Sequence, residues 1–292
     1  MLEHKKIQNL SDYFVELNSR REKGVYFYRI NGYSEEVGEF IKKYYDTARR
    51  TGVVIEGKIP NPDEGNLAYY NEIMGMDFQM SMDFIHVSLR KWLPRMNEFQ
   101  RQNVAASIYD SLDSLRKAGK TENMLRNAYI KFMCWLYYKF ERIVNQLGEN
   151  HIPKILYEGQ ISNYELMLIS ILSNAGCDVV LLQYAGDQGY LKTDPGSVLS
   201  DSLQMEGMQP FPPGYCVKKV RDEIQNELNN ERLYGTRPSL TNCTNAWIKG
   251  NGLDDIRESI LLRGSDSRFF YNCFCRINGA EDKLTYANEL FR

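Results

Sequence analysis

Three short segments of the chain carry residue types that suit the binding of an anionic small molecule. Each segment is expected to follow a strand of a parallel sheet, where ligands bind beyond the carboxyl ends of the strands. The segments are residues 29–32, 158–162 and 184–189. The candidate ligand-binding residues within them are Arg29, Asn31, Gly32, Gly159, Ser162 and Asp187.

These residues differ in the chemistry that they offer. Arg29 has a fixed charge and a fork of N–H donors that suits a phosphate. Gly159 and Ser162 precede a predicted helix, whose free N–H groups and positive dipole end favour an anion. Asp187 is an acceptor for a ribose or sugar hydroxyl. Each segment also has a purely structural interpretation: Ser162 as a helix cap, Asn31 and Gly32 as a turn, and Asp187 as a solvated side chain.

Several enzyme classes lack their sequence motifs. The chain contains no G-x-G-x-x-G after the first strand of either predicted unit and no G-x-x-x-x-G-K-[ST], which argues against dinucleotide and P-loop binding. It contains no G-x-S-x-G, and its three histidines lie in no catalytic motif. Asp187 and Asp194 could flank a cation, but paired acids in a loop are usually hydrated. Neither a metal site nor a particular cofactor is predicted, and the sequence leaves open whether the protein is an enzyme.

Two strand–helix–strand patterns position these residues. Residues 25–30 are aromatic and β-branched, Ser34 is a suitable helix cap, and residues 53–55 begin a second strand. This spacing predicts a parallel βαβ unit.

The second pattern is clearer than the first. A strand at residues 154–157 is followed by Ser162 and Glu165, the S-x-x-E pattern of a capping box, and by an apolar helix. Residues 177–182 form a nearly unbroken apolar run, which is typical of a strand covered on both faces. We expect residues 154–158 and 178–184 to be adjacent parallel strands.

Between the two patterns lies a helical region. Apolar residues recur at helical spacing through residues 78–147, which predicts several packed helices. The expected fold is therefore α/β, with parallel Rossmann-like βαβ units and a helical insertion. The expected division is a Rossmann-like domain at residues 1–76 and 148–250, with the helical insertion at 77–147.

The end of the chain resembles its beginning. Arg29-Ile30-Asn31-Gly32 recurs as Arg276-Ile277-Asn278-Gly279, and in both places an aromatic segment precedes it. This internal repeat predicts that residues 253–292 begin a second, truncated repeat unit, so that the 292 residues are a fragment of a longer protein.

Charge and composition exclude some partners. The 36 Lys and Arg residues nearly balance the 38 Asp and Glu residues, giving a net charge of −2, so no basic field draws the protein to nucleic acid. No apolar run approaches the roughly 20 residues that span a bilayer. The first residues contain no signal core, and the six cysteines are scattered. We expect a cytoplasmic protein with no nucleic-acid partner and no direct membrane span.

Several stretches of the chain resemble the YceG-like family. They are F-Y-R-I-N-G-Y at residues 27–33, V-V-I-E-G-K-I-P-N-P at 53–62, I-S-N-Y-E-L at 161–166, A-G-C-D-V-V at 175–180, T-N-A-W-I at 244–248 and R-I-N-G-A-E-D-K-L-T-Y at 276–286. The resemblance implies a component of a bacterial biosynthetic module associated with tellurium-resistance and general-stress operons, with proteins of those operons as partners. It implies no catalytic residues.

Two functional hypotheses remain. The first is a domain that binds a nucleotide sugar or another phosphometabolite, similar to glycosyltransferases by analogy of fold alone. The second is a non-catalytic assembly or scaffold component of a membrane-associated stress-response complex, which would use the helical region to bind its partners. An exposed apolar patch on residues 78–147 would favour the second hypothesis.

Overall fold

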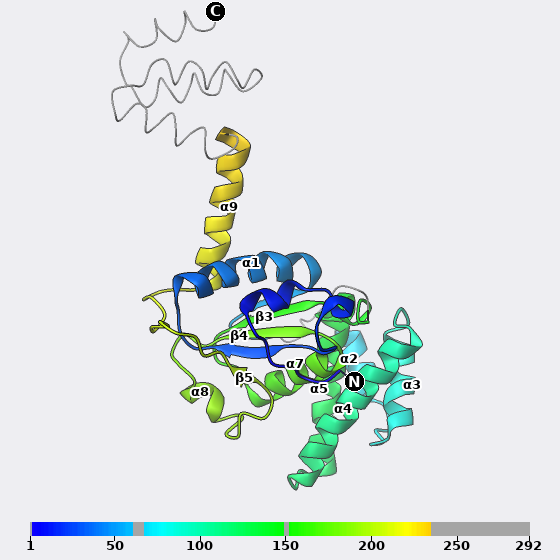
Figure 1. Ribbon diagram of the computed structural model, residues 1–292. Helices are drawn as coiled ribbons and strands as arrows, with labels where there is room; N and C mark the ends of the chain where they lie inside the picture. The colour runs from blue at the N-terminus through cyan, green and yellow to red at the C-terminus, as the bar shows by residue number, and fades with distance from the viewer. Residues whose placement is uncertain (1, 61–66, 149–151, 235–292) are drawn as a thin grey trace, which may run out of the picture. The chain divides into compact units, whose positions relative to one another are not determined.

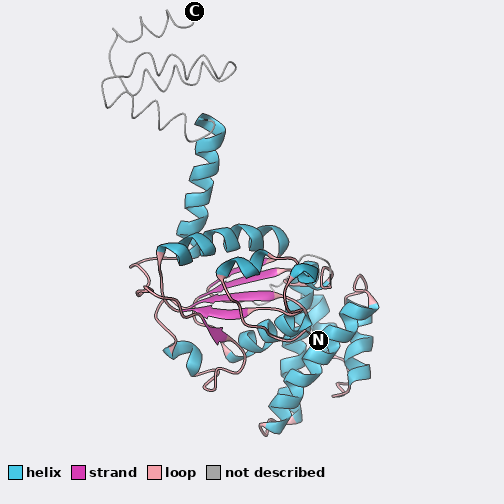
Figure 2. Cartoon of the chain, viewed as in Figure 1, coloured by secondary structure: helices cyan, strands magenta, loops and turns pink. Residues whose placement is uncertain are grey.

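The computed structural model describes residues 2–60, 67–148 and 152–234. It divides into two compact units, residues 1–217 and 218–292. The first unit contains a five-stranded sheet in the order β2-β3-β4-β1-β5, with every neighbouring pair parallel (Figures 1 and 2). The expected α/β fold with a parallel sheet is confirmed.

The strands are short and largely buried. They are β1 (Phe27–Ile30), β2 (Val53–Glu56), β3 (Lys154–Glu158), β4 (Asp178–Leu182) and β5 (Asp201–Ser202). Every residue of β4 is buried, as its apolar sequence predicts for a central parallel strand. The strands β3 and β4 pair in parallel from Lys154–Asp178 to Glu158–Leu182, so the expected adjacency of these two segments is confirmed.

The first strand–helix–strand pattern forms a parallel unit as expected, but its two strands are not neighbours. The strands β1 and β2 are parallel in one sheet, but β3 and β4 lie between them. β1 pairs with β4, and β2 pairs with β3. The connecting helix α1 (Glu35–Thr51) packs over β2 and β3, which shows how one 17-residue helix spans the gap. Ser34 caps α1 as expected, with its hydroxyl accepting the Val37 N–H.

Helices cover both faces of the sheet. α1 lies on one face, and α7 (Asn163–Ala175) lies on the other, with α4 (Glu98–Lys117) and α5 (Glu122–Tyr138) beyond it (Figure 1). The helices between β2 and β3 are α2 (Leu67–Met74), α3 (Met82–Trp92), α4 (Glu98–Lys117), α5 (Glu122–Tyr138) and α6 (Glu141–Val144). Buried residues of this region, such as Ile108 and Phe132, share one hydrophobic core with Val179 and Leu181 of β4. The insertion therefore packs on the sheet through α7.

The segment after β4 contains two short elements. They are α8 (Gln188–Leu191) and β5, which extends the sheet beyond β1. A further helix, α9, runs from Val217 to Tyr234. The expected second repeat unit at residues 253–292 lies outside the described residues. No helix among the described residues combines the length and the apolar character that crossing a membrane requires.

A candidate binding crevice at the carboxyl edge of the sheet

The connections of the sheet create a crevice between β1 and β4. From β1 the chain continues through α1 to β2, which is one edge strand of the sheet. From β4 it continues through α8 to β5, which is the other edge strand. β1 and β4 are neighbours, so the two connections run past each other in opposite directions along the sheet. In open parallel sheets ligands bind at such a switch point, beyond the carboxyl ends of the strands.

A cleft of about 470 Å³ lies at this point. Asn31 and Gly32 line it from the end of β1, and Tyr184, Ala185 and Gly186 line it from the end of β4. The remaining wall comes from the segment after β5: Leu203, Gln204, Met208, Gln209 and Pro210. The volume falls within the range of about 300–1,000 Å³ that is usual for small-molecule sites.

The wall after β5 is attached to the end of β1 by a short antiparallel bridge. The Tyr33 N–H donates to the Gln209 carbonyl at 2.6 Å, and the Gln209 N–H donates to the Tyr33 carbonyl at 2.8 Å. Gly32 lies directly beneath this wall: a Cβ atom there would be 3.1 Å from both the Gln209 carbonyl oxygen and the Met208 Cε. The absence of a side chain at residue 32 therefore permits the close approach that forms the cleft.

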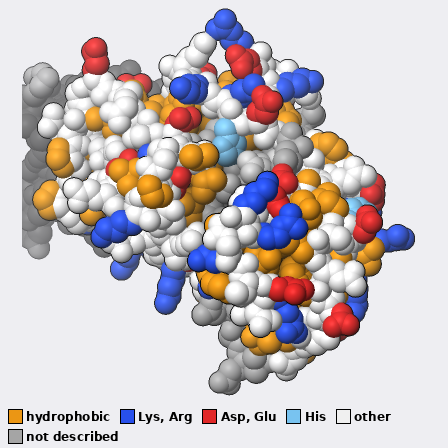
Figure 3. Space-filling model, turned by 90° about the horizontal axis from the view of Figure 1, so that it is seen from below, with side chains coloured by type: hydrophobic (Ala, Val, Ile, Leu, Met, Phe, Trp, Pro, Cys, Tyr) orange, Lys and Arg blue, Asp and Glu red, His pale blue; other side chains and the backbone are white. Residues whose placement is uncertain are grey.

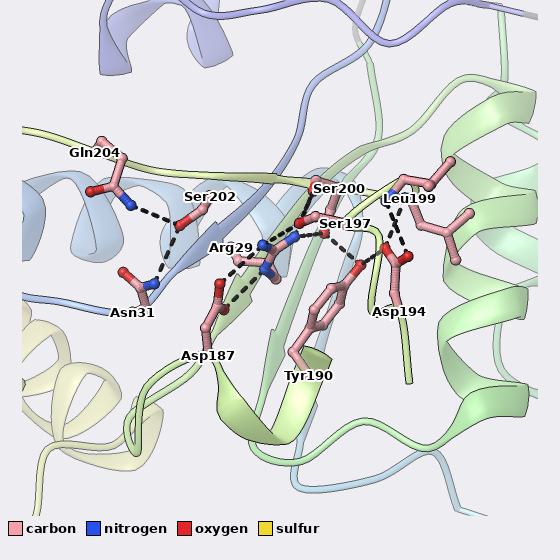
Figure 4. Close-up of polar contacts among 11 residues, drawn as sticks. Arg29, Asn31, Asp187, Tyr190, Asp194, Ser197, Leu199, Ser200, Ser202 and Gln204 are labelled. Carbon is pink, nitrogen blue, oxygen red and sulfur yellow. Dashed lines mark hydrogen bonds and ion pairs between the residues drawn. The ribbon is translucent and has the colours of Figure 1, made fainter. Parts of the chain in front are cut away.

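Two carboxamides are held in the cleft by one hydroxyl. The Asn31 Nδ2 donates to the Ser202 Oγ at 3.2 Å, and the Gln204 Nε2 donates to the same oxygen at 3.1 Å (Figure 4). Ser202 belongs to β5, in register with Arg29 of β1. The edge strand thus sets the orientation of both amides.

Arg29 lies next to these amides, buried and fully hydrogen-bonded. Its Nε and Nη2 each lie 3.0 Å from an oxygen of Asp187, and its Nη1 donates to the carbonyl and the hydroxyl of Ser200 at 2.5 and 2.8 Å. Its Nη2 also donates to the Ser197 Oγ at 2.5 Å, and the guanidinium lies 4.1 Å from the centre of the Tyr190 ring. The side chain is 2% exposed, and these contacts engage all five N–H groups. This geometry favours a positioning role for Arg29 over contact with a ligand.

A buried carboxylate organises the loop that holds Arg29. Asp194 accepts the Tyr190 hydroxyl at 2.9 Å and the backbone N–H groups of Val198 and Leu199 at 3.0 and 2.9 Å. Burial raises the pKa of Tyr190, so this phenol keeps its proton and donates it. Ser197, between these contacts, has a φ of 51°, which is uncommon for a residue other than glycine. These contacts set the path of the loop around Arg29.

Tyr184 and Glu158 form a second polar pair at the edge of the cleft. The Tyr184 hydroxyl donates to the Glu158 Oε2 at 2.6 Å, and the Val217 N–H donates to the same oxygen at 2.8 Å. Burial raises the pKa of Tyr184, with a further contribution from Glu158. The Tyr184 ring packs against Phe211, with 5.0 Å between the ring centres. At neutral pH the phenol is thus a hydrogen-bond donor already committed to a carboxylate.

Gly159 and Ser162, like Arg29 and Asp187, are not among the residues that line the cleft. Gly159, with a φ of 100°, donates its N–H to the Leu182 carbonyl at 3.3 Å, and its carbonyl accepts from the Gln183 Nε2 at 3.1 Å. These bonds join the end of β3 to the end of β4. The Gln183 N–H donates to the Ile30 carbonyl at 2.9 Å, so the ends of β1, β3 and β4 do converge.

Ser162 has a capping role at α7. Ser162 and Glu165 form the expected capping box, in which the Glu165 Oε2 accepts the Ser162 N–H at 3.0 Å and the Ser162 hydroxyl at 2.5 Å. The Glu165 Oε1 accepts the Ile59 N–H at 2.7 Å. A carboxylate therefore already occupies the positive end of this helix, which disfavours a second anion there.

Sequence reasoning placed Asn31 and Gly32 beside the crevice but missed most of its other lining. Gln204 and Gln209 follow a strand of two residues that has no periodic pattern, so no local signal marked them. Ser197 and Ser200 lie in the loop before that strand, where no periodic pattern marked them either. Among the described residues, no group of three or more His, Cys, Asp or Glu side chains is arranged to hold a metal ion.

Comparison with known proteins gives one match. A family model described as the YceG domain matches residues 5–225, which include the whole sheet and the crevice. No curated protein and no solved structure matches the chain.

Proposed function

Since the chain belongs to the YceG domain family, we propose that its function is to bind a small-molecule ligand in the crevice between β1 and β4. One observation supports this proposal above the others. A cleft of ligand size opens where the connections of two neighbouring parallel strands run in opposite directions, and Asn31, Gly32 and Tyr184 line it.

The ligand class that we propose is a nucleotide sugar or a related sugar metabolite. The parallel sheet and the position of the crevice resemble the nucleotide-binding arrangement of Rossmann-like folds, by analogy. In this proposal the domain serves a biosynthetic module associated with tellurium-resistance and general-stress operons. Asn31 and Gly32 lie at the ligand, Arg29 and Asp187 position the wall, and Gly159 and Ser162 support the neighbouring strand and helix.

The proposal is one of binding rather than of a particular reaction. Of the residues that line the cleft, only Tyr184 carries a group that can lose a proton, and its proton is held by Glu158. A reaction in the crevice would draw on this pair as its acid or base.

A thermal-shift screen of sugars, sugar phosphates, nucleotides and sugar nucleotides tests the proposal. A ligand that binds the folded state raises the melting temperature by mass action. We expect at least one compound to do so, and Asn31→Leu to abolish the shift. Gln102→Leu, at an exposed position on α4 outside the cleft, is the matched control and keeps the shift. A screen without hits, or hits that survive Asn31→Leu, would contradict binding in the crevice.

The helical region supports a second candidate, a scaffold that binds partner proteins of the stress operons. Val87 on α3 is 64% exposed and Phe99 on α4 is 55% exposed. Figure 3 shows hydrophobic side chains on one face of the molecule, interspersed with charged groups. Cross-linking of the chain to its operon neighbours, with Val87→Ser and Phe99→Ser as variants, tests this candidate. Loss of the cross-links in both variants would support it.

A further inference from the structure

The crevice is lined entirely by uncharged residues. None of its ten lining residues is Lys, Arg, His, Asp or Glu. Three of them, Asn31, Gln204 and Gln209, carry carboxamides, and Leu203, Met208 and Pro210 supply apolar surface. The hydrogen-bonding capacity of the side chains therefore comes from neutral groups that both donate and accept.

The cation nearest to the crevice in the sequence is not available to a ligand. Arg29 precedes Asn31 by two residues, but Asp187 neutralises its charge and protein acceptors engage its N–H groups. A phosphate carries a charge of about −1.5 to −2 at neutral pH and is held by cations or by several aligned N–H donors. An anion placed in this cleft would lose water without gaining a counter-charge, which is unfavourable.

The two carboxamides bound to Ser202 present acceptors. Each NH2 group donates one of its two N–H hydrogens to the Ser202 hydroxyl, and the carbonyl oxygens of Asn31 and Gln204 lie on the side away from Ser202 (Figure 4). These oxygens pair with groups that donate hydrogen bonds. Sugar and polyol hydroxyls are donors, whereas the oxygens of an ionised phosphate only accept.

On these grounds, and resting on the proposed binding function, we propose that the crevice recognises the uncharged, hydroxyl-bearing part of its ligand. The ligand class is a sugar or polyol, held through its hydroxyl groups by Asn31 and Gln204. Apolar C–H faces of the sugar pack against Leu203, Met208 and Pro210. Any phosphate that the ligand carries lies outside the cleft.

Saturation-transfer NMR with matched pairs of compounds tests this proposal. The probes are glucose and glucose 1-phosphate, ribose and ribose 5-phosphate, UDP-glucose and UDP, and inorganic phosphate alone. We expect at least one free sugar to bind and the sugar protons of its esters to receive the strongest saturation. UDP and inorganic phosphate are expected not to compete. Because no charge is involved, the dissociation constant should change less than about twofold between about 50 and 500 mM NaCl.

Two substitutions at residue 31 separate acceptor recognition from anion recognition. Asn31→Asp keeps acceptor oxygens and allows the Ser202 hydroxyl to donate to one of them, so sugar binding should stay within about threefold of that of the wild type. Asn31→Leu has a similar volume but no acceptor, and we expect it to weaken sugar binding by more than about tenfold.

The possible outcomes distinguish this inference from the proposed function. If phosphate, UDP or the esters bind through Asn31 and the free sugars do not, the sugar assignment is wrong while binding in the crevice stands. Loss of that binding in Asn31→Asp, together with a strong salt dependence, would lead to the same conclusion. If no probe binds in a manner that depends on Asn31, both the inference and the proposed function fail.

Discussion

Arg29 on β1 and Asp187 after β4 form a two-pronged ion pair, with the guanidinium Nε and Nη2 each 3.0 Å from a carboxylate oxygen. The pair joins two segments that are far apart in the chain and lies beside the crevice. Arg29 is buried, so removing either partner leaves the other charge without its counter-charge and destabilises the fold.

Arg29→Met is expected to lower the free energy of unfolding by about 3–5 kcal/mol, because Asp187 and the acceptors of Ser197 and Ser200 lose their donor. Urea denaturation measures this loss. The double variant Arg29→Met/Asp187→Leu should recover part of it, which a double-mutant cycle quantifies. If Arg29→Lys kept full stability and lost only ligand affinity, Arg29 would be a ligand contact as the sequence suggests.

A second buried cluster, at the amino-terminal ends of the strands, depends on Asp178 at the start of β4. Its carboxylate pairs with Arg20, accepts the Lys154 Nζ at 2.5 Å and accepts the Tyr26 N–H at 2.9 Å. Asp178→Asn leaves two buried cations without a counter-charge, so we expect a loss of about 3–5 kcal/mol in the free energy of unfolding.

Lys154→Met is the informative comparison for that variant. Burial lowers the pKa of Lys154, so the interior already disfavours its charge, and the Arg20–Asp178 pair survives the substitution. We expect a cost below about 1.5 kcal/mol, measured in the same urea titrations. Equal losses in the two variants would show that Lys154 is as necessary as Asp178.

Two substitutions in the capping box of α7 compare the loss of the cap alone with the loss of the cap and a buried hydrogen bond. Ser162→Ala should cost about 0.5–2 kcal/mol, as for other helix caps. Glu165→Ala removes the same cap and also leaves the buried Ile59 N–H without its acceptor, so its cost should exceed that of Ser162→Ala by about 1–3 kcal/mol. Thermal and urea denaturation of the two variants check the order, and ligand affinity in the crevice should survive Ser162→Ala.

Gly52, between α1 and β2, touches the neighbouring strand β3. A Cβ atom at residue 52 would lie 1.7 Å from the Lys154 carbonyl oxygen, so Gly52→Ala forces two backbone segments apart. We expect a loss above about 3 kcal/mol, beyond the usual cost of overpacking. At Gly119, where φ is 80° and nothing lies within 4 Å of the added atom, alanine should cost only about 1–2 kcal/mol.

Alkaline pH should destabilise the protein through its buried tyrosines. Burial raises the pKa of Tyr129 to about 12, and it also raises the pKa values of Tyr69, Tyr157 and Tyr190 above the usual value of 10.0. The unfolded chain releases these protons near pH 10 and the folded chain keeps them. The free energy of unfolding is therefore at its full value below pH 10 and falls above it.

Each such group contributes a slope of up to about 1.4 kcal/mol per pH unit. Urea titrations from about pH 8 to about pH 11 measure the fall, and Tyr129→Phe should make it shallower. A free energy of unfolding that stays constant to pH 11 would contradict the buried state of these phenols.

The sequence predicted the parts of the fold that depend on local patterns. The apolar run of β4 indicated a strand covered on both faces, and Ser162 and Glu165 marked the start of α7. The pairing of β1 with β4 was not predictable, because parallel partners are separated by a helix and nothing local in residues 27–30 distinguishes β4 from β2 as a neighbour.

Part of the crevice lining was predictable from the local sequence. Asn31 and Gly32 directly follow a recognisable strand, so their position at the sheet edge could be inferred. The partners of Arg29 could not be, because Ser197 and Ser200 lie in an irregular loop whose path is set by the hydrogen bonds of Asp194. An arginine at the end of a strand has the same local sequence whether it meets a ligand or an aspartate.

The strand order has a consequence for synthesis on the ribosome. Phe27 and Tyr28 pair with Val179 and Val180, so the apolar strand β1 leaves the ribosome about 150 residues before its partner exists. At roughly 5–20 residues per second the interval is about 8–30 seconds, during which the strand has both edges unpaired. Completion of the sheet also closes a long loop, which slows folding. The interval before β4 emerges is therefore the period in which the nascent chain is most exposed to aggregation and most dependent on chaperones.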